Sequence, residues 1–247
     1  MPMAKLEIQD VSKTFDGTSV LDHLTFQLKD KEFVSILGPS GSGKSTLFHV
    51  IGGLLSPDSG DIVMDGSSIT GQRGKISYMP QSPSLLPWRT VLENVLLGSE
   101  IQGKTDREQA LRMIEKSGLS GYEHTYPEQL SGGMKQRVSF IRSLLSPQPV
   151  ICLDEPFSAL DEFTRHDMQK WLLSIWEEHQ RSILFITHNI EEALFLSDRI
   201  IVLSDRPAHV QKEFTVPFSR PRDPSLVLTE PFLTCKKQIY KEIRKLS

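Results

Sequence analysis

A glycine-rich stretch constrains the fold of this 247-residue chain more than any other feature of its sequence. It reads Gly38-Pro39-Ser40-Gly41-Ser42-Gly43-Lys44-Ser45-Thr46. The stretch matches the phosphate-loop pattern G-x4-G-K-[ST] in full, and it lies between an apolar run and a helical pattern. Glycines let the backbone curl so that its N–H groups point at phosphate oxygens, and the helix adds its positive N-terminal end. The sequence therefore predicts a phosphate-binding loop. A dinucleotide-binding loop is disfavoured, because the third glycine of that pattern is missing.

A second motif supplies the carboxylates that such a loop needs for catalysis. The apolar run Val150–Leu153 ends in Asp154 and Glu155. Adjacent carboxylates at a strand end are often only a solvated turn, but a complete phosphate loop earlier in the chain favours a catalytic role. We expect Lys44 to bridge the outer phosphates and the Ser45 hydroxyl to ligate Mg2+. Asp154 is expected to hold the water shell of that ion, and Glu155 to polarise the attacking water as a general base.

The hydrophobic patterns predict strands and helices that alternate around a helical insert. Short strands are expected over residues 3–37 and 60–80, and helical spacing follows over 90–146. After the insert the chain returns to strand, helix, strand and strand, at residues 150–153, 161–179, 183–187 and 200–203. This order predicts an α/β core with a parallel sheet and a helical subdomain inserted at about residues 85–147. We expect the core domain to span residues 1–205. A short basic tail would follow at 206–247, with a helical end near Lys236–Leu246.

Composition indicates an ordinary globular protein. The formal net charge of -3 and the pI of about 6.2 give no global bias toward nucleic acid, although residues 206–247 carry nine Lys/Arg against four Asp/Glu. Two cysteines are too few for a disulfide framework. No stretch approaches the roughly 18 apolar residues that a spanning helix needs, and the N-terminus lacks the apolar core of a signal peptide. We therefore expect that the chain does not cross a membrane alone.

A third motif separates this chain from other proteins with a phosphate loop. It reads Leu130-Ser131-Gly132-Gly133-Met134-Lys135-Gln136-Arg137. Ser131 and the glycines precede a helical pattern, so free N–H groups and a hydroxyl form a second anion site. With the other motifs in the same order, the chain resembles the ABC ATPase family, whose signature is LSGGQ. Met134 replaces the Gln of that signature. The anion-binding atoms belong mainly to Ser131, Gly132 and Gly133, so we expect this departure to matter little.

Four further positions resemble motifs of the same family. Gln81 resembles the Q-loop glutamine that reaches Mg2+ and the attacking water. Residues 158–161 resemble the D-loop, which crosses a dimer interface. His188 resembles the switch histidine that contacts the γ-phosphate and orients Glu155, although a lone histidine is usually structural. Phe15 is the candidate for the aromatic residue that stacks on adenine, although half-buried aromatic residues at strand ends are common.

The resemblance implies both a fold and a mechanism. The fold would be a P-loop NTPase core with a parallel sheet, an N-terminal antiparallel β subdomain and the inserted helical subdomain. The cofactors would be ATP and Mg2+. Two copies would form a head-to-tail homodimer, in which the signature of one copy covers the γ-phosphate at the phosphate loop of the other. Hydrolysis would then open the dimer.

Two regions indicate which kind of ABC protein the chain resembles, namely the ATPase subunit of a membrane transporter. After Gln81, Leu85 and Leu86 lie between two prolines and Trp88 follows the second, which fits an apolar cleft for a short cytoplasmic helix of a membrane permease. The alternative is a loop packed on its own subdomain. The tail, with Val216-Pro217-Phe218-Ser219-Arg220-Pro221-Arg222, resembles ATPase subunits of importers for nitrate, sulfonate, taurine and thiamine-precursor pyrimidines. Such subunits lie at the cytoplasmic face of the membrane and work with a separate solute-binding protein. The basic tail could equally be solvated charge on a frayed end, or contact lipid headgroups or a partner.

The expected function is ATP hydrolysis that powers an ABC importer. Two other functions would use the same motifs, and the sequence disfavours both. A soluble ABC ATPase acting on nucleic acid or ribosomes usually carries long coiled-coil inserts or two ATPase units, and this chain has one unit and no sustained heptad run. We therefore expect no nucleic-acid partner. A nucleotide-binding module without turnover is disfavoured because Glu155 and His188 are both present.

Overall fold

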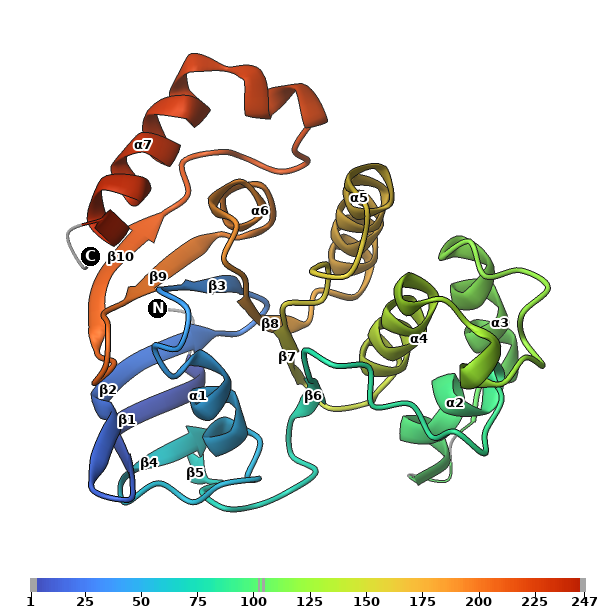
Figure 1. Ribbon diagram of the computed structural model, residues 1–247, viewed down its shortest axis with the longest axis horizontal. Helices are drawn as coiled ribbons and strands as arrows, with labels where there is room; N and C mark the ends of the chain where they lie inside the picture. Colours follow the sequence, from blue (N-terminus) through green and yellow to red (C-terminus); the bar gives the residue numbers. More distant parts are fainter. Residues whose placement is uncertain (1–3, 102, 104, 245–247) are drawn as a thin grey trace. The chain divides into compact units, whose positions relative to one another are not determined.

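The chain forms two compact units in the computed structural model, which describes residues 4–101, 103 and 105–244. The first unit joins the residues up to Ile76 with those from Arg181 onward, and the second spans Ser77–Gln180. The chain therefore leaves the first unit at Ile76 and returns to it at Arg181 (Figure 1). The strand start expected at Met3 and the helix end expected at Leu246 lie outside the described residues.

An antiparallel sheet forms the N-terminal part of the first unit. Its strand order is β2-β1-β4-β5. The bounds are β1 (Ala4–Phe15), β2 (Thr18–Lys29), β4 (Ser59–Met64) and β5 (Ser67–Ser68). Alternating residues of β1 and β2 are buried, and Ile8 pairs with Phe26. The turn between these strands uses Asp16 and Gly17, both at positive φ, as expected of a tight hairpin whose twist matches its strands.

A second sheet in the same unit carries the parallel strands. The order within this unit is β10-β9-β3-β8. The bounds are β3 (Phe33–Leu37), β8 (Ser182–Ile186), β9 (Arg199–Leu203) and β10 (Val210–Thr215). Strand β3 is parallel to both β8 and β9, and all five of its residues are buried. This is why its sequence is apolar at every position but Ser35 and does not alternate. Helix α1 (Lys44–Ile51) follows β3, and α6 (Ile190–Leu196) follows β8.

The C-terminal residues fold onto this sheet. Strand β10 pairs with β9, so the prediction that the strand at 200–203 is the last one is wrong. The sequence indicated this strand only weakly, because β10 mixes charged, exposed residues with half-buried ones. A 3-10 turn (Pro224–Leu228) and helix α7 (Glu230–Arg244) follow, and the helix starts earlier than the predicted Lys236. Phe232 and Ile239 of α7 are buried in one cluster with Leu194 of α6.

The second unit is mainly helical. It contains β6 (Ser77–Met79), α2 (Val91–Ile101), α3 (Arg107–Lys116), a 3-10 turn (Pro127–Gln129), α4 (Gly132–Leu144), β7 (Val150–Asp154) and α5 (Glu162–His179). Strands β6 and β7 are parallel, and α2, α3 and α4 pack against one another. Val91, Val95 and Ile114, which set the helical spacing in the sequence, are buried, as are Val138 and Ile141. No helix in the described part of the chain is long and apolar enough to span a membrane.

Candidate functional site

The phosphate loop connects β3 to α1 in the first unit. Gly41 and Gly43 have positive φ values of 78° and 108°, which L side chains rarely adopt. A Cβ atom at Gly43 would lie 2.9 Å from Val20 Cγ1 and 3.2 Å from the Val20 carbonyl oxygen. Backbone conformation and close packing against β2 therefore both require glycine here. No side chain caps the N-terminus of α1, so its first N–H groups are available to an anion.

The Lys44 side chain turns back into this loop. Its ammonium group donates hydrogen bonds to the carbonyl oxygens of Gly38, at 2.9 Å, and Pro39, at 2.7 Å. The Lys44 residue is only 7 % exposed, while Ser45 next to it is exposed. The loop thus holds a cation inside its curve and presents a hydroxyl at the first turn of α1, which suits a bound polyphosphate.

The parallel pairing of β3 and β8 brings His188 near the start of the phosphate loop. Ile36 is paired with Ile186, so Gly38 and His188 each follow two residues later at the same edge of the sheet. Adjacent strands lie about 4.8 Å apart. His188 is exposed and directly precedes Asn189, the N-cap of α6, whose side chain accepts hydrogen bonds from the N–H groups of Glu191 and Glu192.

The Glu192 side chain contacts Thr187, the residue before His188. Its carboxylate accepts a hydrogen bond from the Thr187 hydroxyl at 2.6 Å. That hydroxyl in turn accepts one from the Asn189 N–H group at 3.0 Å. Residues on both sides of His188 are therefore held by one buried hydrogen-bond chain.

Phe15 ends strand β1 beside the same loop. It pairs with Thr18 across the hairpin, and Val20, which packs on Gly43, is two residues further along β2. That separation corresponds to about 7 Å of strand. Phe15 is 41 % exposed, and the Lys13 ammonium lies 5.5 Å from its ring centroid. An exposed aromatic ring close to the phosphate loop can stack on a planar base.

The second unit brings the carboxylates and Gln81 together. Met79 of β6 pairs with Leu153 of β7, so Gln81 and Glu155 emerge at the same strand ends. The Gln81 amide donates a hydrogen bond to the Glu155 carboxylate at 3.0 Å. Glu155 has a positive φ of 47°, a conformation that is uncommon for residues other than glycine and often marks functional sites.

Gln136 of α4 is a site residue to which sequence reasoning assigned no role. It is 1 % exposed, and its amide nitrogen lies 3.4 Å from the carbonyl oxygen of Gln81 and 3.5 Å from that of Glu155. An amide side chain among the apolar positions of a predicted helix is unusual, and this feature of the sequence could have revealed Gln136.

Asp154 is buried, in contrast to Glu155, and its charge acts on its neighbours. Asp154 is 2 % exposed at the end of β7. Burial, with the negative charge of Asp154 added, raises the pKa of both the Tyr78 hydroxyl and the Cys152 thiol. Both groups therefore stay protonated at neutral pH. The fully buried Cys152 packs in the core of its unit.

The signature segment begins helix α4. Ser131 is the N-cap, and its hydroxyl accepts a hydrogen bond from the Met134 N–H group at 3.3 Å. Ser131 and Gly132 are exposed. A Cβ atom at Gly133 would lie 3.3 Å from Leu160 Cδ2, so the signature and the predicted D-loop are neighbours. The unit therefore presents the exposed N-terminal end of α4 beside the residues that resemble the D-loop.

The family comparison decides what these motifs belong to. A model of the ABC transporter family matches residues 21–158, which include the phosphate loop, the signature and both carboxylates. The chain belongs to the ABC transporter family. As an ABC ATPase it is an ATP-binding and ATP-hydrolysing subunit, and the resemblance stated from the sequence is confirmed.

Relatives of this ABC ATPase match over nearly its whole length. The formylaminopyrimidine import ATP-binding protein ThiZ of Halalkalibacterium halodurans is 44 % identical over 98 % of this chain and 95 % of its own. The aliphatic sulfonates import ATP-binding protein SsuB of Bacillus cereus is 39 % identical over 96 % and 95 %. The nitrate import ATP-binding protein NrtD of Synechocystis sp. is 43 % identical over 85 % and 82 %.

Solved ABC cassettes share the fold. A dimeric cassette in a post-hydrolysis state bound to ADP and Pi has a TM-score of 0.78 and 31 % identity, covering 87 % of this ABC ATPase and 100 % of that chain. A nucleotide-free cassette has a TM-score of 0.75 and 26 % identity, covering 87 % and 92 %. The predicted P-loop ABC ATPase fold is therefore confirmed.

Each unit of the ABC ATPase, taken by itself, carries oxygen donors of the kind that Mg2+ takes when substrate phosphates supply its other ligands. Among the residues described, no cluster of three or more His, Cys, Asp or Glu side chains could hold a metal ion. The first unit offers the exposed Ser45 hydroxyl, and the second offers the carboxylate of Asp154 and the amide oxygen of Gln81. Hard oxygen ligands of this kind, one or two from protein, are what Mg2+ takes when phosphates complete its octahedron.

Proposed function

We propose that this ABC ATPase powers the import of a small solute of the formylaminopyrimidine, sulfonate, nitrate or taurine type. One observation carries the proposal: relatives with import functions match the chain almost from end to end, including the C-terminal region beyond the ATPase motifs. The ATPase does not itself select the solute, so a class is proposed and not one molecule.

In this proposal the phosphate loop binds ATP. The N–H groups of residues 38–46 and the N-terminus of α1 surround the phosphates, and Lys44 exchanges its bonds to loop carbonyls for the outer phosphates. Phe15 stacks on the adenine. Ser45, Gln81 and Asp154 would hold Mg2+, which neutralises charge on the β- and γ-phosphates when bound.

The chemical step is transfer of the γ-phosphoryl group to water. The water oxygen forms a bond to the γ-phosphorus while the bond from that phosphorus to the bridging oxygen breaks. The water proton passes to the Glu155 carboxylate, and ADP and inorganic phosphate leave. Gln81, which bonds Glu155, and His188 orient the carboxylate and the water.

The exposed signature supports a shared site between two copies. Ser131 and the adjoining N–H groups of α4 form an anion site at the surface of the chain. A second copy, arranged head to tail, would place this site against the γ-phosphate of the first. ATP then joins the two copies and hydrolysis separates them, which is the movement that a membrane partner can use.

The membrane partner is proposed to contact the segment after Gln81. Leu85 and Leu86 are half-buried, and Trp88 is 71 % exposed. A large exposed aromatic beside apolar side chains suits a short amphipathic helix of a permease subunit. The chain would thus work at the cytoplasmic face of the membrane, with a solute-binding protein supplying the ligand on the other side.

Reconstitution tests this function. The complex of the chain with its permease and binding protein would be placed in liposomes, and ATP hydrolysis measured with each of the four solute types. Stimulation by one solute and its accumulation in the lumen reached by import are expected. Equal basal hydrolysis with all four solute types and no uptake would contradict the solute class. Association of the purified chain with ribosomes or DNA instead would favour the soluble ATPase.

A further inference from the structure

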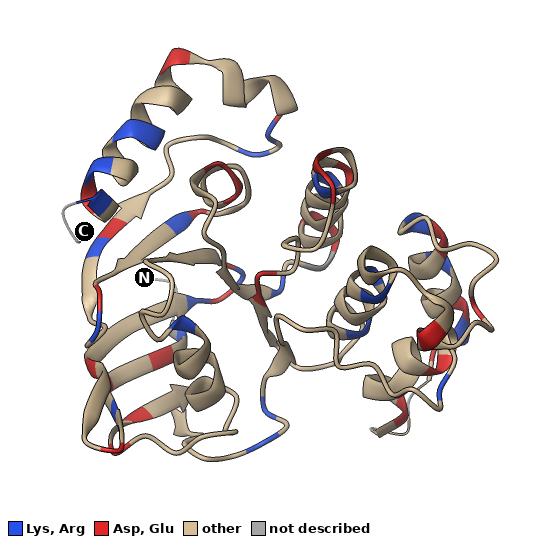
Figure 2. Cartoon of the chain, viewed as in Figure 1, with Lys and Arg blue, Asp and Glu red and all other residues tan. Residues whose placement is uncertain are grey.

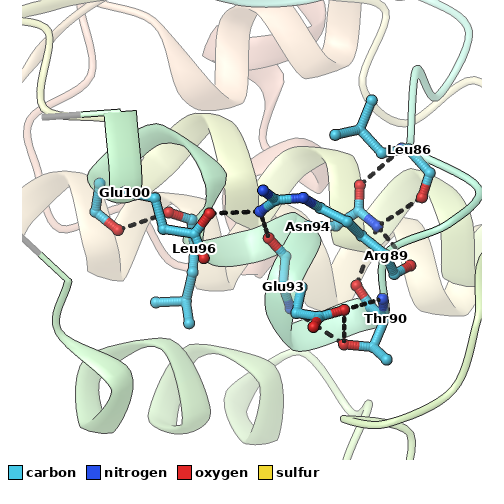
Figure 3. Close-up of polar contacts among 8 residues, drawn as sticks. Leu86, Arg89, Thr90, Glu93, Asn94, Leu96 and Glu100 are labelled. Carbon is cyan, nitrogen blue, oxygen red and sulfur yellow. Dashed lines mark hydrogen bonds and ion pairs between the residues drawn. The ribbon is translucent and has the colours of Figure 1, made fainter. Parts of the chain in front are cut away.

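The segment proposed to contact the permease is hydrogen-bonded through its backbone to one buried side chain. We name residues 82–90 the docking segment. Asn94, in the first turn of α2, is 0 % exposed. Its Oδ1 atom accepts a hydrogen bond from the Leu86 N–H group at 2.8 Å, and its Nδ2 atom donates to the Leu86 carbonyl at 3.1 Å (Figure 3). Nδ2 also lies 3.0 Å from the carbonyl oxygens of both Arg89 and Thr90.

These bonds define a tight turn with Trp88 on it. The Arg89 N–H group donates to the Leu86 carbonyl at 3.1 Å, which closes a four-residue turn. Pro87 occupies the second position, where its fixed φ favours such a turn, and Trp88 the third. Asn94 binds both ends of this turn, so it determines the direction in which the exposed Trp88 points.

Two further contacts hold the flanks of the docking segment. At the α2 end, the Thr90 N–H group donates to the Glu93 carboxylate at 2.8 Å, and Glu93 N–H donates to the Thr90 hydroxyl at 3.3 Å, which is a capping box. At the other end, Arg142 of α4 donates to the Ser84 carbonyl at 2.7 Å. The segment therefore has a defined shape before any partner arrives.

An amide is the group that this position requires. The position needs one acceptor, for the Leu86 N–H group, and a donor facing three carbonyl oxygens. A carboxylate has nearly the same shape, but it is acceptor-only when ionised and would place a negative charge against those carbonyls. Preorganisation of a binding segment raises affinity because less conformational freedom is lost on association.

We infer that Asn94 is a positioning residue for the permease contact: its carboxamide fixes the Leu86–Arg89 turn so that Trp88 is presented to the membrane subunit. This inference rests on the proposed function of the docking segment. Asn94 touches neither ATP nor the reacting atoms, so its effect lies in assembly with the permease and not in nucleotide binding.

Hydrogen exchange of the isolated chain tests the first half of the inference. In Asn94→Asp the bond from Nδ2 to the Leu86 carbonyl is lost, so exchange of the Arg89 amide, which closes the turn on that carbonyl, should accelerate roughly tenfold or more, while α1 and the phosphate loop keep wild-type rates. The matched control is Ser99→Ala on the same helix, which removes only a bond to the Leu96 carbonyl. Wild-type exchange at Arg89 in Asn94→Asp would overturn the inference.

Co-purification with the permease tests the second half. The permease that is recovered from membranes with the wild-type chain, identified by its peptide masses, is quantified per ATPase chain. Asn94→Asp should recover it roughly tenfold less, with nucleotide affinity unchanged. Pro87 is exposed, and Pro87→Gly makes the same turn more flexible, so this variant should also recover less permease. It tests the inference if Asn94→Asp fails to fold. Normal recovery with either folded variant would overturn the inference.

A third variant separates this inference from the proposed function. Trp88→Gln leaves the turn intact and removes the exposed ring. If Trp88→Gln assembles normally, the docking segment is not the permease contact and the proposed function fails at that point. If Trp88→Gln loses the permease but Asn94→Asp and Pro87→Gly keep it, docking is right and positioning by Asn94 is wrong.

Discussion

Glu155, the proposed base, adopts a backbone conformation that costs free energy. Its φ of 47° lies in the left-handed region, which costs roughly 1 kcal/mol or more for a residue with a Cβ atom. The Ser158 N–H group and hydroxyl both donate to the Glu155 carbonyl, at 3.2 and 3.0 Å, and Gln81 bonds its carboxylate. These bonds keep the carboxylate at the strand end, directly after the buried Asp154.

Replacing that carboxylate tests its role as the base. Glu155→Gln keeps the shape and can still pair with Gln81, but it can no longer accept a proton. We expect the rate of ATP hydrolysis to fall by about 10² to 10⁴ while ATP binding persists. Steady-state hydrolysis and equilibrium nucleotide titration measure the two effects. A hydrolysis rate within twofold of wild type would remove Glu155 from the base role.

The two cysteines differ in reactivity for a physical reason. Cys152 is fully buried in β7, and burial together with the Asp154 charge raises its thiol pKa, so it forms little thiolate. Cys235 on α7 is half-buried. In the native protein, iodoacetamide should label Cys235 and spare Cys152, and unfolding in urea should expose both. Rapid native labelling of Cys152, read by peptide mass, would contradict this burial.

At the scale of elements, the C-terminal region donates hydrogen bonds to the carbonyl groups at the C-terminal end of α6. Arg220 donates to the Asp198 carboxylate and to the Leu196 carbonyl. Arg222 is 8 % exposed and donates to the carbonyls of Leu194 and Phe195 in the last turn of α6. Lys and Arg residues recur along α7 (Figure 2), and Lys236 pairs with Glu191. Arg220 and Arg222 of the basic tail are therefore structural groups of the first unit.

Loss of Arg222 should destabilise this unit. Burial, with the Arg220 charge added, lowers the pKa of Arg222 to about 10, so the guanidinium is still charged at neutral pH and its bonds are charge-assisted. Arg222→Met leaves buried carbonyls unpaired at a cost of roughly 1–3 kcal/mol. For a chain of this size, that corresponds to about 2–4 °C of Tm per kcal/mol. Arg206→Met, at an exposed position of the same region, is the control and should change Tm by less than about 1 °C.

At the scale of the whole molecule, the signature segment of one chain is exposed. Ser131 and Gly132 are exposed at the N-terminus of α4, beside the residues that resemble the D-loop. A solved relative with the same fold is a dimer bound to ADP and Pi. Two copies would therefore be the functional assembly, each supplying a signature to the other.

Mixing two inactive variants tests this sharing. In Ser131→Arg the signature is blocked, and in Glu155→Gln the base is lost, so each variant alone should be almost inactive. A mixed dimer has one complete site, formed by Glu155 of the first chain and Ser131 of the second. Random pairing should therefore restore about a quarter of wild-type hydrolysis when equal amounts are combined before ATP is added. If each chain hydrolysed ATP within itself, the mixture would stay inactive.

The sequence by itself determined the phosphate loop, the carboxylates, the signature and the order of the buried strands. These features are local: spacing, glycine content and continuous apolar runs carry them without knowledge of distant contacts. It also determined the family, because several such motifs occur in one order. The edge strand β10 escaped detection because charged residues on an exposed edge leave only a weak apolar pattern.

Only the tertiary structure decided which distant residues meet. Gly38 and His188 reach one sheet edge because β3 pairs with β8, and Gln81 reaches Glu155 because β6 pairs with β7. The hydrogen-bond partners of the buried Gln136 and Asn94 amides could not be predicted, since a polar residue on a helix shows its partners only after folding. Pairing and burial are long-range properties, and this is the physical reason why local patterns could not supply them.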